Sequence, residues 1–232
     1  MVFVVGMKVM NSLNVLYEDN HIIVVVKPEN VPVQEDSSKD LDLVTMIKRY
    51  LKEKYNKPGN VYLGLVHRLD RPVSGIMVFA KTSKAASRLS EEVRLRKVKK
   101  KYLAVVHGIL NKKSGELLNY IVKNRNNDSI ISVNQKGKLA KLKYCVLEEN
   151  KERNLSLVDI DLETGRHHQI RVQFANIGHY LYGDQRYGIQ DKKQIALLSY
   201  SLEFIHPIKK ESIKFEISPP KKDIWRVFKS VK

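Results

Sequence analysis

Residues 67–81 read His67-Arg68-Leu69-Asp70-Arg71-Pro72-Val73-Ser74-Gly75-Ile76-Met77-Val78-Phe79-Ala80-Lys81 and place a carboxylate between two arginines, just before an apolar run. The apolar run predicts a short buried strand, and the Pro and Gly before it predict a tight turn. We therefore expect Asp70 on a loop that the core braces. Two flanking cations favour its ionised form. An ordinary Asp–Arg pair in a turn explains the same stretch about equally well.

The composition of the 232-residue chain indicates a globular protein with a polyanionic partner. Hydrophobic residues make up 43% of it, which is neither a disordered nor a membrane composition. Lys and Arg number 42 against 25 Asp and Glu, a net charge of +17. Nucleic acid fits this charge better than a membrane, because the sequence shows no long apolar span and no basic amphipathic anchor. A generally basic proteome is the alternative explanation of the charge.

The single cysteine, Cys145, excludes an internal disulfide framework and a cysteine-cluster metal site. The cytoplasm is therefore the location expected by default. The apolar residues 1–9 lack the basic segment and the cleavage pattern of a signal peptide, so none is expected.

Apolar residues at helical spacing predict two helices. The first covers residues 37–55 with Asp40 as its cap, and its apolar stripe consists of Leu43, Met46, Ile47, Tyr50 and Leu51. The second begins after Thr82 or Ser83, and its inward face carries Ala86, Leu89 and Val93. The first stripe is expected to pack in the core rather than bind a cofactor.

A basic run follows the second helix, with six cations in the eight residues 94–101. Lysine and arginine contacts to phosphates supply most of the non-specific affinity for RNA. The candidates for such contacts are Arg94, Arg96, Lys97, Lys99 and Lys100. A solvated face without a partner is the alternative explanation of the run.

The second informative stretch is Thr164-Gly165-Arg166-His167-His168-Gln169-Ile170-Arg171. It predicts a turn that opens a helix, whose buried stripe is Ile170, Phe174 and Ile177 and whose end is Gly178. The paired histidines suggest a metal site at first sight. Adjacent residues of a helix face different directions, however, and no His-Glu-x-x-His spacing is present. We therefore do not expect zinc here.

Several ordered segments together resemble the RluA-type RNA pseudouridine synthases, the ribosomal large subunit pseudouridine synthase-like family. Residues 67–81 resemble its catalytic motif, and Lys-x-Tyr-x-Ala-x-x-x-Gly at residues 100–108 resembles its second motif. Residues 165–172 resemble its motif Gly-Arg-x-His-Gln-Ile-Arg-Val. The resemblance extends from residue 15 to residue 220.

The resemblance implies an α+β fold, with a mixed, mostly antiparallel sheet split by a central catalytic cleft and flanked by helices. It implies a short extension at residues 1–13 and a single catalytic domain at residues 14–232, without a separate N-terminal RNA-binding domain. The implied reaction is the isomerisation of uridine in RNA to pseudouridine, which needs no cofactor and no metal. The expected protein is a cytoplasmic monomer that binds a stem-loop of ribosomal or transfer RNA.

The resemblance also implies the roles of individual residues. Asp70 is the catalytic nucleophile, Tyr102 stacks on the target base, and Arg171 pairs with Asp70. Ile170 and Leu197 line the pocket under the base. Arg68 is placed to probe the gap that a flipped nucleotide leaves in the RNA.

Four positions depart from the family pattern: Val26, Val73, His167 and Leu198. The family more often has Thr at the positions of Val73 and His167. These departures and the net charge leave open a non-catalytic RNA-binding or RNA-chaperone protein with the same fold. A carboxylate glycosidase acting on nucleosides is a third possibility, but no motif supplies the second acid that it needs.

Overall fold

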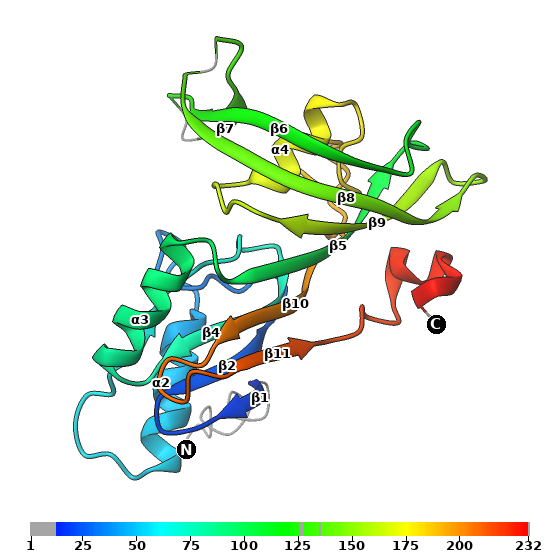
Figure 1. The fold of residues 1–232 in the computed structure, drawn as a ribbon. Helices are drawn as coiled ribbons and strands as arrows, with labels where there is room; N and C mark the ends of the chain where they lie inside the picture. Colours follow the sequence, from blue (N-terminus) through cyan, green and yellow to red (C-terminus); the bar gives the residue numbers. More distant parts are fainter. Residues whose placement is uncertain (1–12, 126–127, 135, 232) are drawn as a thin grey trace. The chain divides into compact units, whose positions relative to one another are not determined.

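The computed structural model describes residues 13–125, 128–134 and 136–231 (Figure 1). The chain forms two compact units, which we call the first unit (Met1–Val98 with Glu203–Phe215) and the second unit (Lys99–Leu202 with Glu216–Lys232). Each unit is described by itself below, and the single domain expected for residues 14–232 stays a prediction. The extension expected at residues 1–13 lies outside the described residues, apart from its last residue.

The strands of the first unit form antiparallel pairs around β2. Strand β2 (Ile22–Lys27) lies between β1 (Asn14–Glu18) and β4 (Ser74–Ala80), and its register with β4 runs from Ile22 opposite Ala80 to Lys27 opposite Gly75. The short strand β3 (Gly64–Leu65) pairs with β4. Nearly every residue of β2 and β4 is buried, which explains why both strands read as continuous apolar runs rather than alternating patterns.

The two predicted helices are present in the first unit, with one boundary corrected. Helix α2 (Leu43–Lys54) begins at the cap Asp42 rather than Asp40, because the Asp42 side chain accepts the Thr45 N–H at 3.0 Å. Helix α3 (Ser83–Arg94) has the predicted cap Thr82, which accepts the Ala85 N–H at 3.2 Å.

The strands of the second unit follow one another in the order β5 (Lys99–His107), β9 (Leu155–Leu162), β8 (Lys138–Asn150), β6 (Ser114–Lys123) and β7 (Ser129–Ile131). Each neighbouring pair in this series is antiparallel. Strands β8 and β9 are joined by a short connection and form a hairpin. Strand β10 (Leu197–Ile205) contributes residues 197–202 to the second unit and 203–205 to the first, and β11 (Ser212–Glu216) pairs with it.

One face of the second unit's sheet is covered by helix α4 (Gln169–Asn176). Tyr102 of β5 lies opposite Ile160 of β9, which in turn lies opposite Tyr144 of β8, so these three side chains share a face. The Tyr144 ring contacts Phe174 of α4, with ring centroids 5.7 Å apart. Tyr102 therefore lies on the face that α4 covers.

The opposite face of this sheet is covered by the 3-10 helices η1 (Asp223–Val227) and η2 (Lys229–Val231). Leu103 and Val105 of β5 pack there with Trp225 and Phe228. The α+β class with mostly antiparallel strands is confirmed, whereas the central catalytic cleft stays a prediction. In the described part of the chain no helix is long and apolar enough to cross a membrane.

Candidate active site

Asp70 lies on a tight turn of the first unit, directly before β4. The Val73 N–H donates to the Asp70 carbonyl at 3.0 Å, and Leu69 and Val73 on either side are buried. The Val78 N–H donates to His67 Nε2 at 3.2 Å, which ties the segment before Asp70 to β4. Gly75 has a φ of 137°, a conformation that favours glycine at the start of the strand. The prediction of a braced loop is confirmed.

Lys27 is the residue that fastens this loop, and sequence reasoning gave it no role. Its side chain is fully buried at the end of β2. The ammonium donates to three backbone carbonyls: Pro28 at 2.8 Å, Val31 at 2.7 Å and Arg71 at 2.8 Å. All three protons of the ammonium are thereby used, and the residue that follows Asp70 is held to the end of β2.

The charges around Lys27 include the carboxylate of Asp70. Burial lowers the pKa of Lys27 to about 7, whereas the attraction of the Asp70 carboxylate acts in the opposite direction. Repulsion from Arg71 adds to the lowering, and Glu29 opposes it. The three carbonyl acceptors favour the ammonium form of Lys27, and in that form it attracts the Asp70 carboxylate.

The side chain of Arg71 forms ion pairs with two other carboxylates, and its effect on the charge of Asp70 stays a prediction. Its guanidinium forms ion pairs with Asp40 and, at 3.5 Å, with Asp36, and it donates to Ser38 Oγ at 2.8 Å. Asp40 is engaged in this contact instead of capping α2. Arg68 is exposed.

The predicted base-binding residues lie in the second unit and are buried. Tyr102, Ile170 and Leu197 are each 5–6% exposed. The Val105 N–H donates to the Ala196 carbonyl, and both residues pack in the cluster on the face covered by η1 and η2. Because successive residues of an extended strand point to opposite faces, Leu197 points to the other face. Tyr102 and Leu197 therefore share the face that is covered by α4, the helix that carries Ile170.

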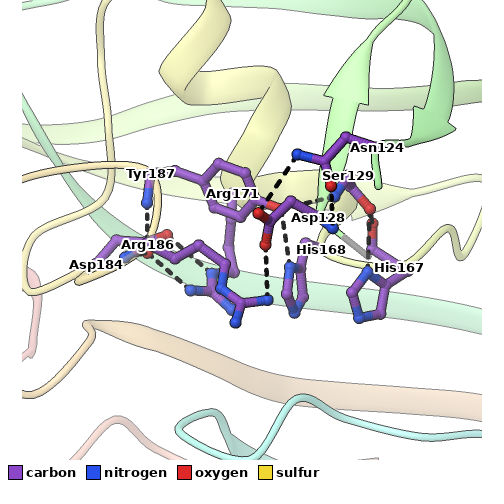
Figure 2. Close-up of polar contacts among 9 residues, drawn as sticks. All are labelled: Asn124, Asp128, Ser129, His167, His168, Arg171, Asp184, Arg186 and Tyr187. Carbon is purple, nitrogen blue, oxygen red and sulfur yellow. Dashed lines mark hydrogen bonds and ion pairs between the residues drawn. The ribbon is translucent and has the colours of Figure 1, made fainter. Parts of the chain in front are cut away.

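Arg171 forms a buried ion pair that the sequence did not reveal. Its guanidinium donates to both carboxylate oxygens of Asp184, at 2.8 and 2.7 Å, as Figure 2 shows. Burial on its own raises the pKa of Asp184, but hydrogen bonds and charge from Arg171, with N–H groups of Arg186 and Tyr187, give a net lowering. Arg171 also lies over the Tyr187 ring, 5.3 Å from its centroid. The pairing of Arg171 with Asp70 stays a prediction.

The two histidines before α4 do not belong to the helix, which begins at Gln169. The premise that they face apart is therefore wrong. His168 has a left-handed backbone, with φ 53°, and its ring stacks on that of His167 with centroids 3.6 Å apart. His167 Nδ1 lies 3.0 Å from Ser129 Oγ, and His168 Nδ1 lies 2.9 Å from the Tyr187 hydroxyl (Figure 2). Among the described residues, no group of three or more metal-binding side chains could hold a metal ion.

Comparison with known proteins identifies the family. A sequence model described as RNA pseudouridylate synthase matches residues 21–176. The chain belongs to the RNA pseudouridylate synthase family. It is accordingly an isomerase that converts uridine in RNA to pseudouridine. The resemblance inferred from the motifs is confirmed.

Individual relatives of this pseudouridylate synthase cover most of its length. An uncharacterised RNA pseudouridine synthase of Aquifex aeolicus is 34% identical over 231 residues, which is 94% of this chain and 72% of the relative. The ribosomal large subunit pseudouridine synthase C of Buchnera aphidicola is 32% identical over 225 residues, covering 90% and 68%. The solved structure of human RNA pseudouridylate synthase domain containing 1 has a TM-score of 0.74 at 25% identity, covering 91% and 85%.

The basic residues predicted to contact RNA differ in their surroundings in the synthase. Arg94 forms an ion pair with Glu91 of the same helix, with Nε and Oε2 2.7 Å apart. Arg96, Lys97 and Lys99 are exposed. Lys100 is partly buried, and burial lowers its pKa. Lys100 is therefore the least suited of the five to meet a phosphate at the surface.

The predicted site residues of the synthase divide between the two units. Asp70, Arg68, Arg94, Arg96 and Lys97 belong to the first unit. The second unit holds Tyr102, Ile170, Arg171, Leu197, Lys99 and Lys100. Within the second unit, Tyr102 and Leu197 lie on the face of the sheet that is covered by α4, the helix that carries Ile170. The assembly of Asp70 with Tyr102 and Arg171 stays a prediction.

Proposed function

We propose that this synthase modifies a uridine of large-subunit ribosomal RNA, with Asp70 as its nucleophile. The RNA class rests on the relatives, because the Buchnera protein, 32% identical over 90% of the chain, carries the name of a ribosomal large subunit synthase. The net charge of +17 supports a polyanionic substrate. Transfer RNA is the competing substrate.

The assignment of Asp70 is carried by the contact of Lys27 with the Arg71 carbonyl. A nucleophilic carboxylate has to be ionised and held in a fixed position. The buried Lys27 ammonium supports both requirements, since it binds the residue after Asp70 and attracts the Asp70 charge. A surface aspartate in an ordinary turn would not need a fully buried cation beneath it.

In the proposed reaction the glycosidic C–N bond breaks, the uracil turns while it is held, and C5 bonds to the ribose C1′. The proton on C5 then leaves to solvent, and N1, which has lost its bond to the ribose, takes up a proton from solvent. Asp70 attacks either C6 of the base or C1′ of the ribose, or assists a glycal route, and its surroundings fit each of these. Because the base has to leave its stack, a loop or bulge of the RNA is the favoured target.

The remaining roles in the proposal concern the extruded base. Tyr102 would replace the lost stacking of the uracil, with Ile170 and Leu197 as apolar walls. These assignments are supported by the shared face of Tyr102 and Leu197 beneath α4. Arg171 would orient Asp70, and the exposed Arg68 would probe the gap in the RNA.

Tritium release from RNA that contains 5-tritiated uridine tests the substrate class. Unmodified transcripts of large-subunit ribosomal RNA and of transfer RNAs are supplied separately. We expect release from the ribosomal transcript, and release from transfer RNA alone would contradict the proposal. Asp70→Asn should release none from either RNA. Asp161→Asn, a change of an exposed carboxylate on β9, serves as the matched control and should behave as wild type.

A further inference from the structure

The C-terminal half of helix α2 carries a concentration of positive charge. Residues 48–57 hold five cations and one carboxylate, Glu53. All five cations are exposed, and we call them the α2 basic surface: Lys48, Arg49, Lys52, Lys54 and Lys57. They are separate in sequence from the basic run at residues 94–101. The α2 basic surface is therefore a second candidate for binding a polyanion.

The spacing of these cations on the helix is unfavourable without a partner. Lys48 stands four residues before Lys52, and Arg49 stands three residues before it, so like charges are neighbours on the helix surface. The negative end of the helix dipole attracts cations of the last turn, which holds Lys52 and Lys54. This attraction does not account for Lys48 and Arg49, which lie one turn earlier. An anionic partner would offset the repulsion.

The cations at the end of the helix gather around an exposed aromatic ring. The ammonium groups of Lys54, Lys57 and Lys81 lie 5.5, 5.9 and 4.8 Å from the centroid of the Tyr55 ring. The Tyr55 hydroxyl donates to Glu18 at 2.7 Å, which holds the ring in place. Glu18 also pairs with Lys54 and Lys81. Three ammonium groups thus share this one carboxylate, and the local charge stays positive.

Helix α2 leads away from the loop that carries Asp70. The Arg71 guanidinium of that loop binds Asp40, which stands three residues before the first residue of the helix, Leu43. The 12 residues of the helix extend over about 18 Å. At about 3.4 Å for each stacked nucleotide of a strand, about six nucleotides cover this distance. RNA that flanks a uridine at Asp70 is therefore long enough to reach the α2 basic surface.

A membrane is the other extended anionic surface that a basic helix binds. Helices of that kind bury an apolar face in the lipid. The apolar face of α2 is already buried in the core, where it consists of Leu43, Met46, Ile47 and Leu51. Only the charged face is left for a partner, which favours RNA, the substrate of this family.

We propose that the α2 basic surface binds backbone phosphates of the substrate RNA, at nucleotides within about six positions of the target uridine. The distance from the target rests on the proposed function, in which Asp70 is the nucleophile. Phosphate contacts position an RNA without reading its bases. The α2 basic surface therefore strengthens substrate binding and leaves the chemical step to the residues at the base.

The test replaces Lys48 and Lys52 together by glutamine, which keeps a long, helix-forming side chain and removes two charges. The probes are transcripts of large-subunit ribosomal RNA and of transfer RNA. Affinity is measured by fluorescence anisotropy at several salt concentrations. The control is the double variant Lys151→Gln with Lys192→Gln, which removes two exposed lysines of the second unit and changes the net charge equally.

We expect Lys48→Gln with Lys52→Gln to reduce the slope of log affinity against log salt by about 1.4–1.8, because each lost phosphate contact removes about 0.7–0.9. This change corresponds to about 20–60-fold weaker binding in 0.1 M salt. In tritium release the KM should rise in proportion, with kcat close to the wild-type value. The control should leave the slope unchanged. Glu53→Gln, which removes the carboxylate among these cations, should strengthen binding.

Equal slopes for wild type and Lys48→Gln with Lys52→Gln would overturn the proposal. An equal loss in the control would also overturn it, because the RNA would then respond to net charge alone. Vesicles of phosphatidylserine that bind the wild type but not this variant, with RNA binding unchanged, would assign the surface to a membrane. Should the variant fail to fold in urea denaturation, unchanged affinity in Glu53→Gln would decide against the proposal.

The proposed function fails on a different observation. A wild type that releases no tritium from either RNA would refute it. The salt slopes are read from binding alone, so they would still decide whether the α2 basic surface binds RNA.

Discussion

The buried ammonium of Lys27 and the backbone carbonyl of Arg71 lie 2.8 Å apart, so the end of β2 holds the residue that follows Asp70. Two more carbonyls, those of Pro28 and Val31, bind the same ammonium. The geometry of the Asp70 loop therefore depends on a side chain that lies more than forty residues earlier in the sequence. This link between a buried cation and the proposed nucleophile has direct consequences for stability and for activity.

Replacing Lys27 by Met should destabilise the first unit and slow catalysis. Three buried carbonyls lose their charged donor in this variant, so the free energy of unfolding should fall by about 2–4 kcal/mol. Urea denaturation measures this decrease. A displaced Asp70 loop should lower kcat by about 10–100-fold. Lys192→Met, a change of an exposed lysine, is the control and should affect neither quantity. Full activity in folded Lys27→Met protein would refute the role of Lys27.

The pH dependence of the free energy of unfolding should reveal the contribution of Glu18, whose carboxylate accepts hydrogen bonds from four side chains. Lys54 and Tyr50 bind one carboxylate oxygen, at 2.7 and 3.0 Å, and Lys81 and Tyr55 bind the other, at 2.6 and 2.7 Å. Burial alone raises the pKa of Glu18, but these donors lower it from 4.5 to about 2. A shift of this size stabilises the folded state by about 3 kcal/mol at neutral pH.

The sign of this effect is set by proton uptake. Between pH 4.5 and about 2 the unfolded chain binds a proton on Glu18 that the folded protein does not. The stabilisation is therefore complete above pH 4.5 and is lost as the pH falls towards 2. Denaturation of wild type and Glu18→Gln across this range should show a difference that shrinks with falling pH. A difference that stays constant would contradict the expectation.

Asp184→Asn should remove the negative charge that the buried guanidinium of Arg171 binds through both carboxylate oxygens. Breaking a pair of this kind costs about 3–5 kcal/mol in the free energy of unfolding. The double variant Arg171→Met with Asp184→Leu removes both charges and should recover part of that loss. If the single variant unfolds at the wild-type urea concentration, the pair does not stabilise the second unit.

The sequence predicts much of the secondary structure, because its signals are local. Continuous apolar runs predict β2 and β4, and the Thr82 cap predicts the start of α3. The start of α2 was wrong because two candidate caps stand two residues apart, and Asp40 is engaged by Arg71 through a contact distant in sequence. Local patterns carry no information about such a competition.

The predicted site residues follow from motif likeness, whereas their supports could not be found in that way. Lys27 ends an apolar strand, and only the packed structure shows that its ammonium turns inward to three carbonyls. Asp184 stands in a loop 13 residues after its partner Arg171. The histidine stack depends on a left-handed residue at His168, a conformation that a non-glycine residue does not signal in sequence.

The basic run should contribute to RNA binding unequally. The exposed Arg96 is expected to meet a phosphate, so Arg96→Gln should weaken binding and reduce the slope of log affinity against log salt by about 0.7–0.9. Arg94→Gln is the matched control, since Arg94 is engaged by Glu91 and should change the slope less. Equal slopes for wild type and Arg96→Gln would support the alternative explanation, in which the basic run is a solvated face without an RNA partner.

The central claim, that Asp70 is the nucleophile, is tested most directly by single-turnover tritium release with enzyme in excess over 5-tritiated ribosomal RNA. Anisotropy measured in parallel shows whether each variant still binds the RNA. We predict that Asp70→Asn binds with near wild-type affinity and releases no tritium above background. Release by Asp70→Asn at the wild-type rate would contradict the account.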